Sequence, residues 1–285
     1  MRIAVASGKG GTGKTTIATS LAVTLTRHGQ SVAYLDCDVE EPNGHLFLKP
    51  CIQSEGPVVR LLPQVDADRC ALCGACARFC QFGAMVCLGE RVVVFSELCH
   101  ACGGCAMVCP NKAISEVLHR TGTVRTGECG KLLFVDGRLN VGEPSGPPVI
   151  HVVKQTAPEA AWTVLDAPPG TGCPVVETLR GSDYVLLVTE PTPFGLHDLK
   201  LAVDLVRALE LPCGVVINRA GTVFRELDDF LEANGIEVLA RLLDDRAVAE
   251  AYACGELICD AVPGWRDEME QLVHRLSSPV CVTTS

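Results

Sequence analysis

The chain has 285 residues, of which 48% are hydrophobic and 20% charged, a mixture that excludes a wholly disordered protein. Its 24 basic and 34 acidic side chains give a formal net charge of -10, which argues against a general nucleic-acid binder. Apolar stretches are too short for a membrane-spanning helix and the N-terminus has no signal-peptide pattern. We therefore expect a cytoplasmic protein without nucleic-acid binding or stable membrane insertion.

Residues 1–63 are predicted to begin an α/β domain. Arg2–Ala6 is a short apolar run, typical of a buried strand. A glycine-rich loop follows it, and then apolar side chains recur at helical spacing until Gly29. Ser31–Leu35 is expected to be a second strand.

Residues 8–15, GKGGTGKT, match the phosphate-binding pattern G-x-x-x-x-G-K-[ST] directly between the first strand and the helix. Glycines allow backbone N–H groups to surround phosphate oxygens, while Lys14 reaches the β- and γ-phosphates and Thr15 ligates magnesium. The motif therefore predicts ATP or ADP and Mg²⁺ as cofactors. The predicted nucleotide contacts are Gly8, Gly10, Gly11, Thr12, Gly13, Lys14, Thr15 and Thr16.

Residues 64–118 contain nine of the 17 cysteines and repeat themselves with an offset of 29 residues. Each half has the spacing C-x2-C-x2-C-x3-C of bacterial ferredoxins, in which the last cysteine of each run binds the other cluster. Zinc is the main alternative, but eight cysteines in this register favour two 4Fe-4S clusters. The predicted ligands are Cys70, Cys73, Cys76 and Cys109 for one cluster, and Cys99, Cys102, Cys105 and Cys80 for the other. We expect an inserted ferredoxin-like α+β module that relays electrons, with Cys87 as a packing residue.

Residues 119–285 resume the α/β pattern. Continuous apolar runs at Trp162–Leu165, Tyr184–Val188 and Cys213–Ile217 suit strands buried on both faces, and helical stripes separate them. Residues 122–148 are expected to form a hairpin and loops. Together with residues 1–63, this segment predicts a doubly wound, mostly parallel sheet interrupted by the cysteine-rich insert.

Three aspartates follow predicted strands and are expected at the magnesium site, bound directly or through water: Asp36, Asp38 and Asp166. A strand-terminal aspartate also caps turns, which is the alternative for Asp36. Asn218 ends the VVIN segment.

This chain resembles the MinD/Mrp/ParA P-loop ATPases with an inserted ferredoxin domain, through the segments GKGGTGKT, DCDVEEPN, DAPPGTGC, EPTPFGLHDL and VVIN. That superfamily is related to the nitrogenase iron protein. The resemblance implies a nucleotide sandwiched between two subunits, with Lys9 contacting phosphate across the dimer. It implies that Asp38 orients the attacking water in switch I and that Asp166 is the Walker B acid, followed by switch II. By the same resemblance, Asn218 contacts adenine.

Three functions remain open at this stage. The first is a slow, partner-stimulated ATPase that gates electron transfer to a redox partner, as a homodimer or a heterodimer with a paralogue. The second is an Mrp-type iron-sulfur cluster carrier, although Cys254 and Cys259 have C-x4-C spacing where Mrp-type scaffolds have C-x2-C. The third is a MinD-like positioning ATPase with redox-sensing clusters. An interfacial third cluster would use Cys173 with Cys129, for which buried thiols are the alternative.

Overall fold

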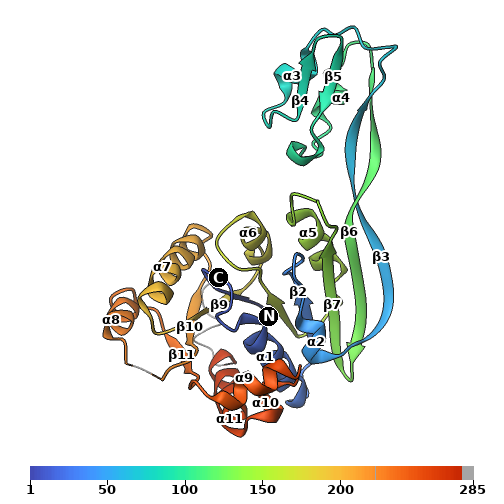
Figure 1. Ribbon diagram of the computed structural model, residues 1–285. Coiled ribbons are helices and arrows are strands. Elements are labelled where there is room, and N and C mark those ends of the chain that lie inside the picture. Colours follow the sequence, from blue (N-terminus) through green and yellow to red (C-terminus); the bar gives the residue numbers. More distant parts are fainter. Residues whose placement is uncertain (222, 278–285) are drawn as a thin grey trace.

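The computed structural model describes residues 1–221 and 223–277, and its centre is a twisted sheet (Figure 1). Within these residues the sheet has nine strands in the order β11-β10-β9-β1-β8-β2-β7-β6-β3. All neighbours from β11 to β7 are parallel, whereas β6 is antiparallel to both β7 and β3. The mostly parallel α/β sheet is therefore confirmed. Its strands are β1 Arg2–Ala6, β2 Val32–Asp36, β3 Cys51–Val65, β6 Ile114–Cys129, β7 Leu132–Leu139, β8 Trp162–Asp166, β9 Tyr184–Thr189, β10 Cys213–Ile217 and β11 Val238–Arg241.

Helices cover both faces of this sheet, because its central strands are apolar on both sides. One face packs against α1 (Lys14–Arg27), α9 (Arg246–Ala253), α10 (Ile258–Ala261) and α11 (Pro263–Leu276). The other packs against α5 (Pro147–Thr156), α6 (Cys173–Leu179), α7 (Pro193–Ala208) and α8 (Arg225–Ala233). A short helix, α2 (Gly44–Leu48), follows β2.

The last helix docks on the domain through an apolar stripe. Trp265, Met269, Leu272 and Leu276 of α11 are all buried in the core beside α1. None of the described helices is long and apolar enough to span a bilayer.

Strands β3 and β6 form an arm that leaves the sheet (Figure 1). They stay paired from Cys51 opposite Glu128 to Val65 opposite Ile114, whereas β6 pairs with β7 only from Gly122 to Cys129. The unsupported part of β3, residues 59–65, extends roughly 20 Å at about 3.3 Å per residue. The expected boundaries at residues 63/64 and 118/119 fall inside these two strands. The expected hairpin is present as β6 and β7.

The arm carries a small cysteine-rich lobe, residues 66–113, at its end (Figure 1). The lobe consists of α3 (Ala75–Phe79), the β4 (Met85–Leu88) and β5 (Arg91–Val94) hairpin, a 3-10 turn (Ser96–Leu98) and α4 (Gly104–Met107). Its two halves repeat in backbone conformation. Positive φ angles recur at positions 29 residues apart: Leu72 and Ala101, Gly74 and Gly103, Gly83 and Lys112.

Candidate functional site: a nucleotide pocket and a cysteine lobe

The phosphate loop connects β1 to α1, and residues from later in the chain pack closely against it. Gly13 has a φ of 93°, in the left-handed region that favours glycine. A β-carbon there would collide with the Asn218 amide, and one at Gly8 would collide with the backbone carbonyl of Asp198. The hydroxyl of Ser7 donates to the Lys9 carbonyl at 2.6 Å. Glycine is thus needed at these positions for space as well as for conformation.

A cavity of about 490 Å³ opens along this loop. The predicted residues on its wall are Gly10, Gly11, Gly13, Lys14, Thr15, Thr16, Asp38 and Asn218. Gly8, Lys9, Thr12, Asp36 and Asp166 lie outside the wall. The volume and the concave, mixed polar lining are those of a small-molecule site.

Lys14 lies among carboxylates at the start of α1. Burial lowers the pKa of its ammonium, and Asp166 and Asp38 offset part of that shift. Burial raises the pKa of Asp38 to about 6, and the nearby Asp166 carboxylate adds to it. Burial also raises the pKa of Asp166, against the effects of the Thr15 hydroxyl and Lys14. A concentration of buried negative charge of this kind is stabilised by a divalent cation.

Asp36 has a different set of partners. Its Oδ2 accepts from the backbone N–H of Gly44 at 2.9 Å, and its Oδ1 accepts from that of Asp38 at 3.2 Å. Burial and the Asp166 carboxylate raise the pKa of Asp36 well above its ordinary value. Asp36 therefore holds the loop that carries Asp38, as the alternative of a turn-capping aspartate predicts. The Asp36 carboxylate faces backbone groups instead of the pocket.

Three buried oxygen atoms around the phosphate loop have no hydrogen-bond partner within the described residues: Thr12 Oγ1, Asn43 Oδ1 and Asp166 Oδ1. The other Asp166 oxygen accepts from the Tyr34 hydroxyl at 2.9 Å. Buried oxygens left without partners are costly, and a bound cation with its waters satisfies them. The residues therefore fit a magnesium-nucleotide complex.

Asn218 also hydrogen-bonds to the phosphate loop. Its Nδ2 donates to the Thr12 carbonyl at 2.8 Å, and its Oδ1 accepts from the backbone of Arg219 at 3.0 Å. Glu190, which the sequence patterns do not single out, forms ion pairs with the Lys9 and Arg219 side chains beside this loop. Lys9 Nζ lies 3.4 Å from Glu190 Oε2, and Arg219 Nη1 lies 2.6 Å from Glu190 Oε1.

The far wall of the pocket comes from the C-terminal part of the chain, and sequence reasoning missed it. Val248 and Tyr252 of α9 and Trp265 of α11 line this end, together with residues 243–245. No sequence pattern marks these positions, because only the packing of α11 beside α1, and of α9 against α10, brings them to the nucleotide loop.

The lobe contains two small cavities, each surrounded by four cysteines. The first is lined by Cys70, Cys73, Cys76 and Cys109, with Val65, Val92 and Ile114 among its apolar walls. The second is lined by Cys80, Cys99, Cys102 and Cys105, with Pro63, Phe79, Phe82 and Met85. The structure thus brings together the two sets in which the fourth cysteine of each run crosses to the other half.

The thiols of these cavities are free, and backbone groups point at them. All 16 cysteines within the described residues lack a disulfide. The N–H groups of Ala84, Ala101 and Ala113 donate to Cys80, Cys99 and Cys109 at 3.2 to 3.4 Å. Backbone N–H to sulfur contacts stabilise thiolates in iron-sulfur sites.

Across residues 1–221 and 223–277, no three His, Cys, Asp or Glu side chains converge as ligands of a single metal ion. The four thiols that hold a cubane each bind a different iron, so they surround a space instead of converging on a point. The two cavities have that arrangement, and their residues fit the group.

The remaining cysteines do not join these sets. Cys173 is exposed at the start of α6, beyond the carboxyl end of β8, whereas Cys129 is the last residue of β6, beside the amino end of β7. The two lie at opposite ends of the sheet's strands, so the structure does not support their pairing within one chain. Cys87 is partly buried on β4, Cys254 is exposed, and Cys259 is buried. Cys281, expected to be structural, lies outside the described residues.

Comparison with known proteins identifies the body of the molecule. The model of the CobQ/CobB/MinD/ParA nucleotide binding domain matches residues 3–258. The chain belongs to this family. It is therefore a P-loop ATPase of the MinD/ParA type, in agreement with the fold and the phosphate loop.

Several relatives share most of the chain. An uncharacterized protein of Methanocaldococcus jannaschii is 34% identical over 78% of this chain and 79% of its own. An iron-sulfur cluster carrier protein of Pyrococcus horikoshii is 23% identical over 96% and 86%. Among solved structures, the septum site-determining protein MinD of Pyrococcus horikoshii, complexed with Mg-ADP, is 17% identical with a TM-score of 0.62. It covers 100% of this chain and 98% of its own, and at that identity it shows the fold alone.

Proposed function

We propose that this protein is an ATP-hydrolysing iron-sulfur protein that couples nucleotide state to electron transfer through two 4Fe-4S clusters. The observation that carries the proposal is the gathering of the predicted cysteines into two sets of four, each around its own apolar cavity. When bound, such clusters accept and release single electrons, and four thiolates each leave no open iron for substrate chemistry.

On this proposal the chain works as a homodimer, or as a heterodimer with a paralogue, and Lys9 contacts phosphate across the interface. Lys14 and Thr15 hold the β- and γ-phosphates and Mg²⁺, Asp166 binds the ion through water, and Asp38 orients the attacking water. Asp36 acts one step further away, through its hydrogen bonds to the switch I backbone. The arm connects this site to the clusters and to a redox partner.

The test is to purify the protein anaerobically and titrate its clusters by EPR with ADP and with a non-hydrolysable ATP analogue. We expect iron and acid-labile sulfide for two clusters and a nucleotide-dependent potential shift of about 30 mV, which is ~0.7 kcal/mol for a one-electron couple. Clusters with the same potential in both nucleotide states would contradict coupling through redox potential.

A second candidate is delivery of a cluster to other proteins, favoured by the relatives named iron-sulfur cluster carrier protein. The distinguishing property is lability. A relay cluster held by four thiolates survives a chelator and desalting, whereas a cluster meant for delivery transfers to an apo-protein. Each cavity combines four cysteines with apolar walls, which favours retention.

A further inference from the structure

The arm bends where it leaves the sheet. Val58 pairs with Gly122 but Val59 pairs with Arg120, so Thr121 is an extra residue in β6. Such a bulge bends a strand and increases its twist. Thr121 is buried, and its hydroxyl donates to the Val58 carbonyl at 3.3 Å. The bend is therefore a defined point between the ATPase body and the lobe.

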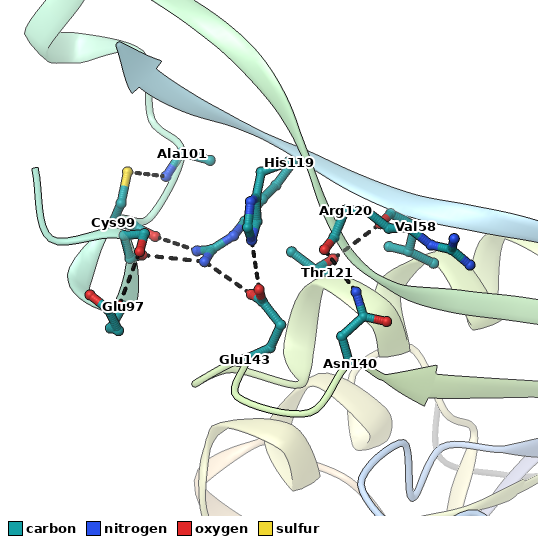
Figure 2. A network of polar contacts seen from close by, with 11 residues as sticks. Val58, Glu97, Cys99, Ala101, His119, Arg120, Thr121, Asn140 and Glu143 are labelled. Carbon is teal, nitrogen blue, oxygen red and sulfur yellow. Dashed lines mark hydrogen bonds and ion pairs between the residues drawn. The ribbon is translucent and has the colours of Figure 1, made fainter. Parts of the chain in front are cut away.

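Just beyond this bend, one residue of the body binds both strands of the arm (Figure 2). Glu143, in the loop between β7 and α5, accepts from Arg60 Nη2 at 3.2 Å and lies 2.6 Å from His119 Nε2. Arg60 also binds the lobe, because Nη1 donates to the Cys99 carbonyl at 2.8 Å and Nη2 to the Ser96 carbonyl at 3.2 Å. Arg60 thus bridges the body and the lobe.

The loop that carries Glu143 is bonded to switch I. The backbone N–H of Leu139 donates to the carbonyl of Val39, the residue after the predicted switch aspartate, at 2.8 Å. The next residue, Asn140, donates to the Thr121 carbonyl at 2.9 Å, and its own carbonyl accepts from Glu143 at 3.1 Å. Hydrogen bonds, together with the peptide bond between Leu139 and Asn140, therefore connect switch I to the bend and to Glu143.

We propose that Glu143 and Arg60 form a latch through which switch I controls the position of the lobe. The inference rests on the proposed function, because it assumes that the Asp38 segment responds to the γ-phosphate. Every latch contact is already at hydrogen-bond distance, so a displacement of Val39 that moves the β7–α5 loop loosens it. The lobe then turns about the Thr121 bend.

Burial and charge give this latch two distinct states. The Arg60 and Glu143 side chains are only 9% and 12% exposed. When a largely buried guanidinium loses its carboxylate partner, only neutral carbonyl partners remain. An unpaired buried charge is unfavourable, so the latch favours being either closed or fully released to water. Coupling between two sites requires a bistable element of this kind.

The test is amide hydrogen exchange, followed by mass spectrometry, on the full chain purified anaerobically. Exchange is compared in Mg-ADP and in a magnesium complex of a non-hydrolysable ATP analogue. In the wild-type protein we expect residues 57–63 and 94–101 to exchange at least about threefold faster with the ATP analogue. In Glu143→Gln we expect fast exchange in both nucleotides.

Two further variants make the result specific. Arg60→Gln breaks the same ion pair from the other side, and the double variant should show a smaller change than the sum of the two single changes, because both lose the shared pair. Glu250→Gln is the matched control, because it removes the same charge from the exposed Arg246–Glu250 pair of α9 and should behave as wild type.

A nucleotide-dependent difference in amide exchange that persists in Glu143→Gln would overturn the latch. Nucleotide-independent exchange in the wild-type protein would overturn it as well. Iron and sulfide are measured on the same samples. Missing clusters would therefore contradict the proposed electron transfer while exchange still tests the latch, and intact clusters with nucleotide-independent exchange would contradict the latch alone.

Discussion

The ammonium of Lys9 lies 3.4 Å from the carboxylate of Glu190 in the same chain. The same carboxylate binds Arg219, so Glu190 is held in place beside the phosphate loop. In the proposed dimer, Lys9 contacts phosphate bound to the opposite subunit. On that proposal Lys9 exchanges Glu190 for the phosphate, so we expect the ion pair to oppose dimerisation.

Glu190→Gln should strengthen the dimer formed with a non-hydrolysable ATP analogue. The expected decrease in dimer dissociation constant is about two- to fivefold, because a partly exposed ion pair contributes up to ~1 kcal/mol. Sedimentation over a range of protein concentrations measures it. Glu232→Gln, on the exposed surface of α8, is the control. A weaker dimer in Glu190→Gln would show that Glu190 supports the interface.

Lys14→Ala should abolish ATP hydrolysis and leave the lobe unchanged. Lys14 lies on the wall of the nucleotide pocket between Asp166 and Asp38, and losing a cation that faces the transferring phosphate lowers turnover at least about 100-fold. Phosphate release and iron content are measured on the same sample, with Lys131→Ala in the exposed β6–β7 turn as control. Loss of iron in Lys14→Ala would contradict separate roles for body and lobe.

The local parts of the fold could be predicted because their signals lie in consecutive residues. The strand from Arg2, the glycine loop and the following helix are each encoded by an uninterrupted pattern, and the repeat of 29 residues gave the cysteine sets. The arm was missed because β3 contains Pro57 and Pro63, which normally argue against a strand. It tolerates them at the edge of the sheet, where one side of the strand needs no donors.

The tertiary parts of the site could not be predicted. Trp265 reaches the pocket only because α11 packs beside α1, and Glu143 reaches Arg60 only because the arm bends at Thr121. These contacts join residues far apart in the chain and leave no periodic pattern.

Substitutions at two cysteines of the lobe should separate cluster ligands from packing residues. Cys70 lines the first cavity, so Cys70→Ala should remove about half of the bound iron and leave the signal of the second cluster. Cys87 lies on β4 outside both cavities, and Cys87→Ala should keep all the iron. Iron analysis and EPR measure both. Equal iron loss in the two variants would mean that the lobe responds to any disturbance of its packing.

The pH dependence of magnesium binding should follow Asp38. Its pKa is about 6 in the folded protein, chiefly because of burial, against an ordinary value of 3.8. Between these values the folded chain holds a proton that the unfolded chain has lost. The free energy of unfolding therefore falls as pH rises through this window, and the destabilisation is absent below it. Above pH 6 the carboxylate is ionised, and it repels Asp166 until a cation neutralises both.

Magnesium should therefore raise the melting temperature more at pH 7.5 than at pH 5.5, where the ion must displace the Asp38 proton. Thermal melts with and without Mg²⁺, at constant ionic strength, measure this difference. Asp38→Asn removes the titrating group and should make the magnesium effect smaller and nearly independent of pH. Equal magnesium effects at the two pH values in the wild-type protein would show that Asp38 does not face the ion, leaving Asp166 and the Thr15 hydroxyl as its protein partners.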